Sequence, residues 1–133
     1  GDMAVDSFSG DIKGSGSILV VDDEPLQRDI TIRMLSELGY KAYQAASGSQ
    51  AVEFIEKREI DLILLDMLMP PGINGSEAYE RILAIKPRQK ALIISGFVNS
   101  SEVEKTLKLG AGGVLKKPFT ISQLGYAVKA ELS

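Results

Sequence analysis

The chain has 133 residues, which is most simply one domain and is long enough to bury a core without disulfides or a structural metal. Hydrophobic residues make up 44% and charged residues 25%, as in an ordinary globular protein, and no apolar run approaches the ~20 residues that span a membrane. The sequence has no cysteine and no histidine, which excludes disulfides, thiolate chemistry and imidazole groups, and its net charge of −3 argues against nucleic-acid binding. The absence of cysteine permits a reducing compartment without proving one, and the expected location is cytoplasmic.

The first seventeen residues differ in composition from the rest of the chain. Eight of them are Gly or Ser, and they show no sustained hydrophobic period. This composition predicts a flexible leader, an interdomain linker or a cloning remnant. We therefore expect residues 1–17 to lie outside the folded domain, which occupies residues 18–133.

From Ile18 onward, short apolar runs alternate with helical patterns. The runs that predict strands are, in chain order, 18–21, 41–46, 61–66, 92–94 and 113–116. The first helix begins at Pro25 and stops at Gly39, with an apolar repeat every four positions at Leu26, Ile30, Met34 and Leu38. Capping pairs open the other helices, at Ser47 with Gln50, Asn74 with Glu77, Asn99 with Glu102 and Thr120 with Gln123. Right-handed crossovers between the five strand–helix pairs predict an α/β fold with a parallel sheet and helices on both faces.

Polar residues end the predicted strands at one edge of this sheet. They are, in chain order, Asp22 and Asp23, Asp66, Ser95, and Lys116 with Lys117. Carboxylates held together require a proton or a cation, and oxygen ligands without His or Cys select Mg²⁺ or Mn²⁺. A carboxylate is also able to attack an activated phosphorus while a metal, an ammonium group and a hydroxyl neutralise the phosphoryl oxygens. The strand ends therefore predict phosphoryl chemistry at a carboxylate.

Each of these residues also has a purely structural interpretation. Asp22 and Asp23 suit the N-terminus of a helix, and Asp66 suits a turn. Ser95 is a common strand-end residue, and a lysine pair is usually a solvated surface feature. The coincidence of all these groups at one edge favours the functional interpretation.

From Ile18 to about Leu132 the chain resembles the receiver domain of two-component response regulators, the CheY-like family. The matching motifs are Leu-Val-Val-Asp-Asp-Glu at 19–24, Leu-Leu-Asp-Met-Leu-Met-Pro at 64–70, Ser95 at the end of the fourth strand, and Lys-Pro-Phe at 117–119. Each motif is weak alone, but their order and spacing together are specific. The resemblance implies a flavodoxin-like (βα)₅ doubly wound sheet with strand order 2-1-3-4-5.

The resemblance also implies roles for the site residues. Asp66 would be the phosphoacceptor, and Ser95 would sense the phosphoryl group. Lys117 rather than Lys116 would pair with the phosphate, because it precedes Pro118 in a bond expected to be cis. The implied Mg²⁺ ligands are Asp66, Asp23 and the backbone carbonyl of Leu68, with Asp22 acting mainly through water.

The sequence departs from the usual receiver pattern in the loops. Pro70-Pro71 stands where one proline is usual, so this loop is expected to be one residue longer. Val114 replaces the aromatic switch residue of many receivers, so we expect signalling through backbone shifts after Ser95. Leu68 and Phe97 are apolar at positions that flank the attacking water, which predicts slow self-dephosphorylation.

The expected partner is a histidine kinase or phosphotransfer protein whose phosphohistidine docks over the site, against the first helix and the loop after Lys117-Pro118. We expect a phosphoacceptor rather than a turnover enzyme, no membrane insertion, and homodimers through the last two helices. Ser95-Gly96-Phe97 and the glycine-rich residues 110–113 resemble receivers attached to hybrid sensor histidine kinases, so the chain is a stand-alone receiver or part of a longer protein.

A degenerate receiver that acts only by protein interaction is the alternative. Two other classes fit less well. A dehalogenase-like phosphatase needs a second Asp two residues after the nucleophile, where this chain has Leu68. A nucleotide- or flavin-binding module needs a glycine-rich loop after the first strand, where this chain has Asp22-Asp23-Glu24-Pro25.

Overall fold

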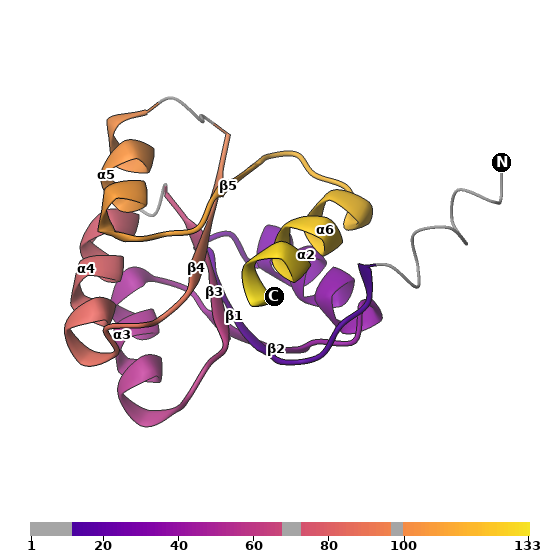
Figure 1. Cartoon of the computed structure of the whole chain (residues 1–133), viewed down its shortest axis with the longest axis horizontal. Helices are drawn as coiled ribbons and strands as arrows, with labels where there is room; N and C mark the ends of the chain where they lie inside the picture. The colour runs from indigo at the N-terminus through magenta and orange to yellow at the C-terminus, as the bar shows by residue number, and fades with distance from the viewer. Residues whose placement is uncertain (1–11, 68–72, 97–99) are drawn as a thin grey trace, which may run out of the picture.

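The computed structural model describes residues 12–67, 73–96 and 100–133. Its centre is a five-stranded parallel sheet in the order β2-β1-β3-β4-β5 (Figure 1). The strands are β1 (Ser17–Val21), β2 (Lys41–Ala45), β3 (Leu62–Asp66), β4 (Ala91–Ser95) and β5 (Val114–Lys116). This order confirms the predicted flavodoxin-like fold class.

Helices cover both faces of the sheet. Within the described residues they are α2 (Pro25–Glu37), α3 (Gly48–Lys57), α4 (Gly75–Ile85), α5 (Ser101–Leu109) and α6 (Ile121–Leu132). Helices α2 and α6 pack together on one face, and α3, α4 and α5 cover the other (Figure 1). The sheet is therefore the middle layer of a three-layer domain.

The central strands contribute side chains to both hydrophobic cores. In β3, Leu62 and Leu64 belong to the core beneath α2 and α6, whereas Ile63 and Leu65 belong to the core beneath the other three helices. All four side chains are fully buried. Successive side chains of a strand point to opposite faces, so a strand covered on both sides needs an uninterrupted apolar run. The sequence of β3 has that run because helices cover both of its faces and exclude water.

Most predicted helix caps are present, and one is displaced. The side chains of Ser47, Asn74 and Thr120 each accept a hydrogen bond from the backbone three residues on. The prediction for α5 was wrong: its N-cap is Ser100, whose hydroxyl accepts a hydrogen bond from the amide of Val103, and Glu102 takes no part in a capping box with it. Ser and Asn cap helices about equally well, so the sequence did not separate Ser100 from its neighbour Asn99, which lies outside the described residues.

The apolar repeat of α2 faces the core over only part of its length. Leu26 is 75% exposed and Ile30 is 40% exposed, whereas Thr31 and Leu35 are buried. A repeat of exactly four residues advances by ~40° around a helix at each step, because a turn contains 3.6 residues. The repeat therefore begins in solvent at Leu26, reaches the edge of the core at the partly buried Met34 and is fully buried only at Leu38.

Residues 12–16, which we call the N-terminal segment, lie against the domain. Ile12 is fully buried in the core beneath α2 and α6. The amide of Gly14 donates to the oxygen of Leu38 at 2.9 Å, and the oxygen of Gly16 accepts from the amide of Lys41 at 2.9 Å. A Cβ on Gly125 of α6 would lie 2.7 Å from the Cβ of Ile12. Gly125 thus provides the space that Ile12 occupies.

In the part of the chain that the structure describes, no helix combines the length and apolarity needed to cross a bilayer.

Candidate functional site

Strand pairing brings the acidic strand ends together. In the register between β1 and β3, Val21 lies beside Leu65, so the next residues of the two strands, Asp22 and Asp66, are also neighbours. These strands lie where the chain reverses its direction of winding, with β2 on one side of β1 and β4 on the far side of β3. Open α/β sheets bind ligands at this switch point, outside the carboxyl ends of the strands.

Three carboxylates converge here and form what we call the acidic cluster: Asp22, Asp23 and Asp66. One carboxylate oxygen from each lies within 4.8 Å of the others. Asp22 is 4% exposed and Asp66 is 5% exposed, whereas Asp23 is exposed. Because like charges repel strongly when they are partly desolvated, this arrangement requires compensating positive charge.

Lys117 supplies part of that charge. Its Nζ lies 3.2 Å from the Oδ2 of Asp66 and 3.7 Å from the Oδ2 of Asp22. Its amide donates to the oxygen of Ser95 at 2.9 Å, which continues the pairing of β4 with β5, and its bond to Pro118 is cis as expected. Lys116 ends β5 as an exposed residue. Of the two lysines, Lys117 is therefore the one that reaches the acidic cluster.

Ser95 closes β4 and is 3% exposed. It lies beside Lys116 in the register between β4 and β5, on the same edge as the acidic cluster. The fourth expected metal ligand, Leu68, lies outside the described residues, as do Pro70, Pro71 and Phe97.

A cavity of about 300 Å³ opens over this edge. Its walls are formed by Asp23, Glu24, Asp66, Gly96 and Lys117. The cavity therefore gives a small anionic group direct access to both the Asp66 carboxylate and the Lys117 ammonium.

The donor set fits a hard divalent cation. The acidic cluster offers only carboxylate oxygens, and it is the one group of three or more potential ligand residues among the residues that the structure describes. Mg²⁺ is bound in proteins through one or two carboxylates together with water and phosphate oxygens. The chain can therefore hold Mg²⁺ without a nitrogen or sulfur ligand, and Mn²⁺ accepts the same donors.

Arg28 belongs to the site but was missed in the sequence. Its guanidinium donates to the backbone oxygen of Asp22 at 2.7 Å and to the Oε1 of Gln44 at 2.7 Å. The available signal was its position five residues after Asp23, on the first turns of the helix that leaves the site. An arginine on a helix is usually a surface charge, so this position alone did not reveal the contact.

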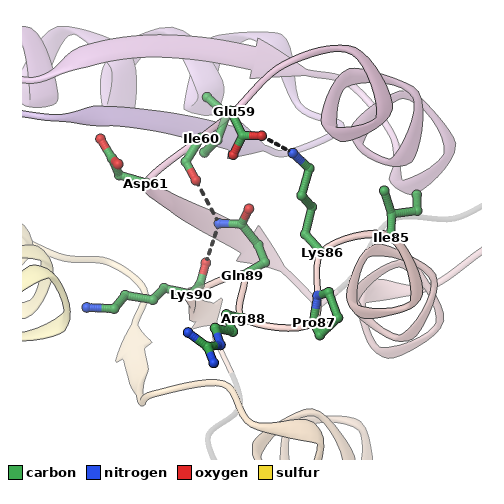
Figure 2. A pocket seen from close by; sticks show the side chains of 9 residues that line it. All are labelled: Glu59, Ile60, Asp61, Ile85, Lys86, Pro87, Arg88, Gln89 and Lys90. Atoms are coloured by element: carbon green, nitrogen blue, oxygen red, sulfur yellow. Dashed lines mark hydrogen bonds and ion pairs between the residues drawn. The ribbon is translucent and has the colours of Figure 1, made fainter.

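A larger cavity, of about 450 Å³, lies at the opposite end of the sheet (Figure 2). It is lined by residues 59–61 before β3 and 85–90 before β4. Some of its polar groups bond to one another: Lys86 pairs with Glu59, and the Gln89 side-chain amide donates to the backbone oxygens of Ile60 and Lys90 at 3.1 Å each. This cavity has no counterpart of the acidic cluster, so we place the chemistry at the other end of the sheet.

Comparison with known proteins agrees with this geometry. Residues 18–129 match the response regulator receiver domain family. Sporulation initiation phosphotransferase F of Bacillus subtilis is 34% identical over 115 residues, which cover 86% of this chain and 92% of that protein. The autoinducer 1 sensor kinase/phosphatase LuxN of Vibrio campbellii is 35% identical over 114 residues, but this chain spans only 13% of its length.

A solved structure shows the same arrangement of strands and helices. It is the receiver domain of sensor histidine kinase PA1611 from Pseudomonas aeruginosa PAO1, with a magnesium ion coordinated in the active site cleft. That domain superposes with a TM-score of 0.81 at 28% identity, over 90% of this chain and 98% of the other.

Proposed function

The chain belongs to the response regulator receiver domain family, and we propose that it accepts a phosphoryl group on Asp66 from a phosphohistidine of a partner protein. The observation that carries this assignment is the contact between Asp66 and Lys117 at 3.2 Å, beneath a cavity that opens to solvent. Asp66 combines a nucleophilic oxygen with an adjacent cation, which is what attack on a phosphoryl group requires.

The transfer exchanges one bond to phosphorus for another. A carboxylate oxygen of Asp66 attacks the phosphorus, and the phosphorus–nitrogen bond to the partner's imidazole breaks. The bonding electron pair stays on the imidazole nitrogen, and the product on Asp66 is an acyl phosphate. Lys117 balances the negative charge of the phosphoryl oxygens throughout, and the Ser95 hydroxyl would donate a hydrogen bond to one of them.

A bound Mg²⁺ would neutralise phosphoryl oxygens as a Lewis acid. We assign its binding to Asp22, Asp23 and Asp66 of the acidic cluster together with the backbone oxygen of Leu68. The similarity to the PA1611 receiver, whose cleft coordinates magnesium, supports this assignment. Mn²⁺ is expected to substitute because it has the same preference for oxygen ligands.

The partner would be a histidine kinase or a phosphotransfer protein. Leu26 and Ile30 support a docking surface beside the site, because they leave an apolar stripe exposed on α2. Exposed Leu107 on α5 and Tyr126 on α6 likewise support homodimer formation through the last two helices. Because Asp66 itself receives the phosphoryl group as an acyl phosphate, the domain acts as a stoichiometric acceptor, and any kinase activity would belong to another part of a longer protein.

The direct test is phosphorylation by a small phosphodonor. The protein and its Asp66→Asn variant are incubated with acetyl phosphate and Mg²⁺, with and without a chelator, and their intact masses are followed. We expect one phosphoryl group on the parent with Mg²⁺ and none on the variant or in the chelator. A gain by both proteins would mean that Asp66 is misassigned, and a gain by neither, even with a phosphohistidine donor, would favour a degenerate receiver that acts by protein interaction alone.

A further inference from the structure

Arg28 connects three elements next to the acidic cluster. Its Nη1 donates to the backbone oxygen of Asp22, in the loop after β1, and its Nε donates to Gln44 near the end of β2, both at 2.7 Å. The side chain itself starts from the first turns of α2 and is half-buried. A guanidinium has several donors in one rigid plane, so it can hold two acceptors from different elements in a defined geometry.

The other polar groups of Asp22 are held as well. Its amide donates to the oxygen of Ala45 at 3.1 Å, and its Oδ1 accepts from the amide of Glu24 at 3.0 Å. The bond from Arg28 therefore holds the remaining backbone group of Asp22, its carbonyl oxygen. Together these contacts leave the residue little freedom to rotate.

This carbonyl belongs to the peptide unit that joins Asp22 to Asp23. A peptide unit is planar, so the direction of its carbonyl also fixes the direction in which the next residue leaves it. Asp23 is exposed, and its carboxylate lies close to that of Asp66. An oriented backbone is enough to explain this approach, without a hydrogen bond from the Asp23 side chain. The geometry of the acidic cluster thus depends on a bond one residue away from Asp23.

We propose that Arg28 is a positioning residue for the cation site: it orients the peptide between Asp22 and Asp23 so that the Asp23 carboxylate faces the cavity beside Asp66. This inference rests on the proposed Mg²⁺-dependent function of the same site. It adds a contribution from α2 and β2 to a site whose acidic residues all follow β1 or end β3.

The charge of Arg28 acts in the opposite direction. A positive charge beside three carboxylates repels a divalent cation, so loss of that charge alone would tighten Mg²⁺ binding. Loss of positioning would weaken Mg²⁺ binding, because the carboxylates would no longer be held in place for the ion. The two effects differ in sign, so the sign of the change in affinity distinguishes them.

Three variants separate these effects. Arg28→Lys keeps the charge but not the planar fork, Arg28→Ala removes both, and Gln44→Leu removes one acceptor of the fork without changing any charge. Arg33→Ala is the matched control, since Arg33 is exposed on the same helix and its loss changes the net charge equally. Thermal unfolding in the presence of a chelator checks that each variant is folded. If substitution of Arg28 prevents folding, Gln44→Leu still tests whether the fork affects Mg²⁺ binding.

The measurement is the Mg²⁺ dissociation constant by calorimetric titration. We expect Arg28→Lys to weaken Mg²⁺ binding by ~10-fold, within the range found for residues that orient metal ligands. Gln44→Leu should weaken it less, and Arg33→Ala should leave it unchanged or slightly tightened. In phosphorylation by acetyl phosphate, Arg28→Lys should raise the Mg²⁺ concentration that gives half the maximal rate while the rate at saturating Mg²⁺ stays close to that of the parent.

Tighter Mg²⁺ binding by Arg28→Ala, or parental binding by Arg28→Lys, would overturn the proposal. Asp23→Asn, titrated in parallel, separates this failure from a failure of the proposed function. If the parent binds Mg²⁺ no better than Asp23→Asn, the cation site itself is misassigned. If Asp23→Asn loses binding while the Arg28 variants keep it, only the positioning role is wrong.

Discussion

The ammonium of Lys117, which follows β5, lies 3.2 Å from the Oδ2 of Asp66 at the end of β3. Two strands separated by β4 thus contribute to one ion pair. The side chain of Lys117 is only 23% exposed, so water screens this pair less than it would screen a surface pair. Lys116, the preceding residue, is exposed and carries the same charge, so it is the matched control.

We expect Lys117→Ala to slow phosphorylation of Asp66 by ~10²–10³-fold, because a preorganised cation at the developing charge contributes about this much. Lys116→Ala should keep a rate close to that of the parent. The rates are measured by intact mass during incubation with acetyl phosphate and saturating Mg²⁺. Equal losses in the two variants would show that general surface charge, rather than the contact with Asp66, assists the reaction.

The contact between Ile12 and Gly125 predicts a non-additive effect on stability. Ile12→Ala should lower the free energy of unfolding by about 2 kcal/mol, since a fully buried side chain is truncated. Gly125→Ala should lower it by about 1 kcal/mol, because crowding against Ile12 outweighs the gain in helix propensity. In the double variant the crowding is partly relieved, because Ile12→Ala removes the Cδ1 and Cγ1 atoms that lie 2.8 and 3.1 Å from the added Cβ, although the Cβ of residue 12 remains. Urea unfolding should therefore give a combined loss below the sum, and strict additivity would argue that the two residues do not touch.

The buried Tyr79 hydroxyl makes stability depend on pH in the alkaline range. Burial, and secondly the charge of Glu131, raises the pKa of Tyr79 above its ordinary value of 10.0, and its hydroxyl donates to the oxygen of Gln89 at 2.7 Å. The native state therefore retains this proton at a pH where the unfolded chain has lost it. The resulting stability is fully present below pH 10 and is lost as the pH rises through the higher native pKa.

Tyr79→Phe should accordingly cost about 1 kcal/mol near neutral pH, as expected for loss of a buried hydrogen bond. The difference between parent and variant should narrow above pH 10. Tyr126→Phe is the control, because Tyr126 is 53% exposed. Unfolding free energies measured across this range would contradict the assignment if the two variants behaved alike.

The lifetime of the acyl phosphate is predicted from two residues that lie outside the described part of the chain. Leu68 and Phe97 cannot orient an attacking water, so loss of the phosphoryl group should be slow. Leu68→Asn and Phe97→Glu should each speed this loss by ~10-fold or more, since a positioned polar group assists proton transfer from water. Phe97→Leu is the apolar control. Decay is followed by intact mass after removal of the phosphodonor, and equal half-lives in all four proteins would refute the prediction.

Val114 on β5 predicts how phosphorylation is transmitted. A half-buried valine has no aromatic ring to rotate, so we expect the change to appear in the backbone after Ser95 and at the start of α5. There the Oγ of Ser76 on α4 donates to Glu102 of α5 at 2.7 Å. Hydrogen exchange of residues 96–109 should differ between the phosphorylated and unphosphorylated protein. Identical exchange in this segment, with Asp66 fully phosphorylated, would rule out this route.

The sequence alone determined the sheet and its acidic edge. Apolar runs such as 62–65 are long enough for buried strands only, and the resemblance to receivers supplied their order. Asp22, Asp23 and Asp66 follow these runs directly, so parallel strands necessarily carry them to one edge. The caps at Asn74 and Thr120 were also predictable, because a cap depends on residues within one helical turn.

Only the tertiary structure decided the contacts between distant residues. The burial of Thr31 instead of Ile30 depends on how α2 lies on the sheet. A four-residue repeat in the sequence does not show how far the helix is rotated about its own axis. The burial of Ile12 depends on Gly125, more than a hundred residues away in the chain. Arg28 contacts Asp22 and Gln44 because α2 starts where β1 and β2 both end. Local patterns set strands, caps and strand ends, whereas helix rotation and side-chain reach are settled by packing in three dimensions.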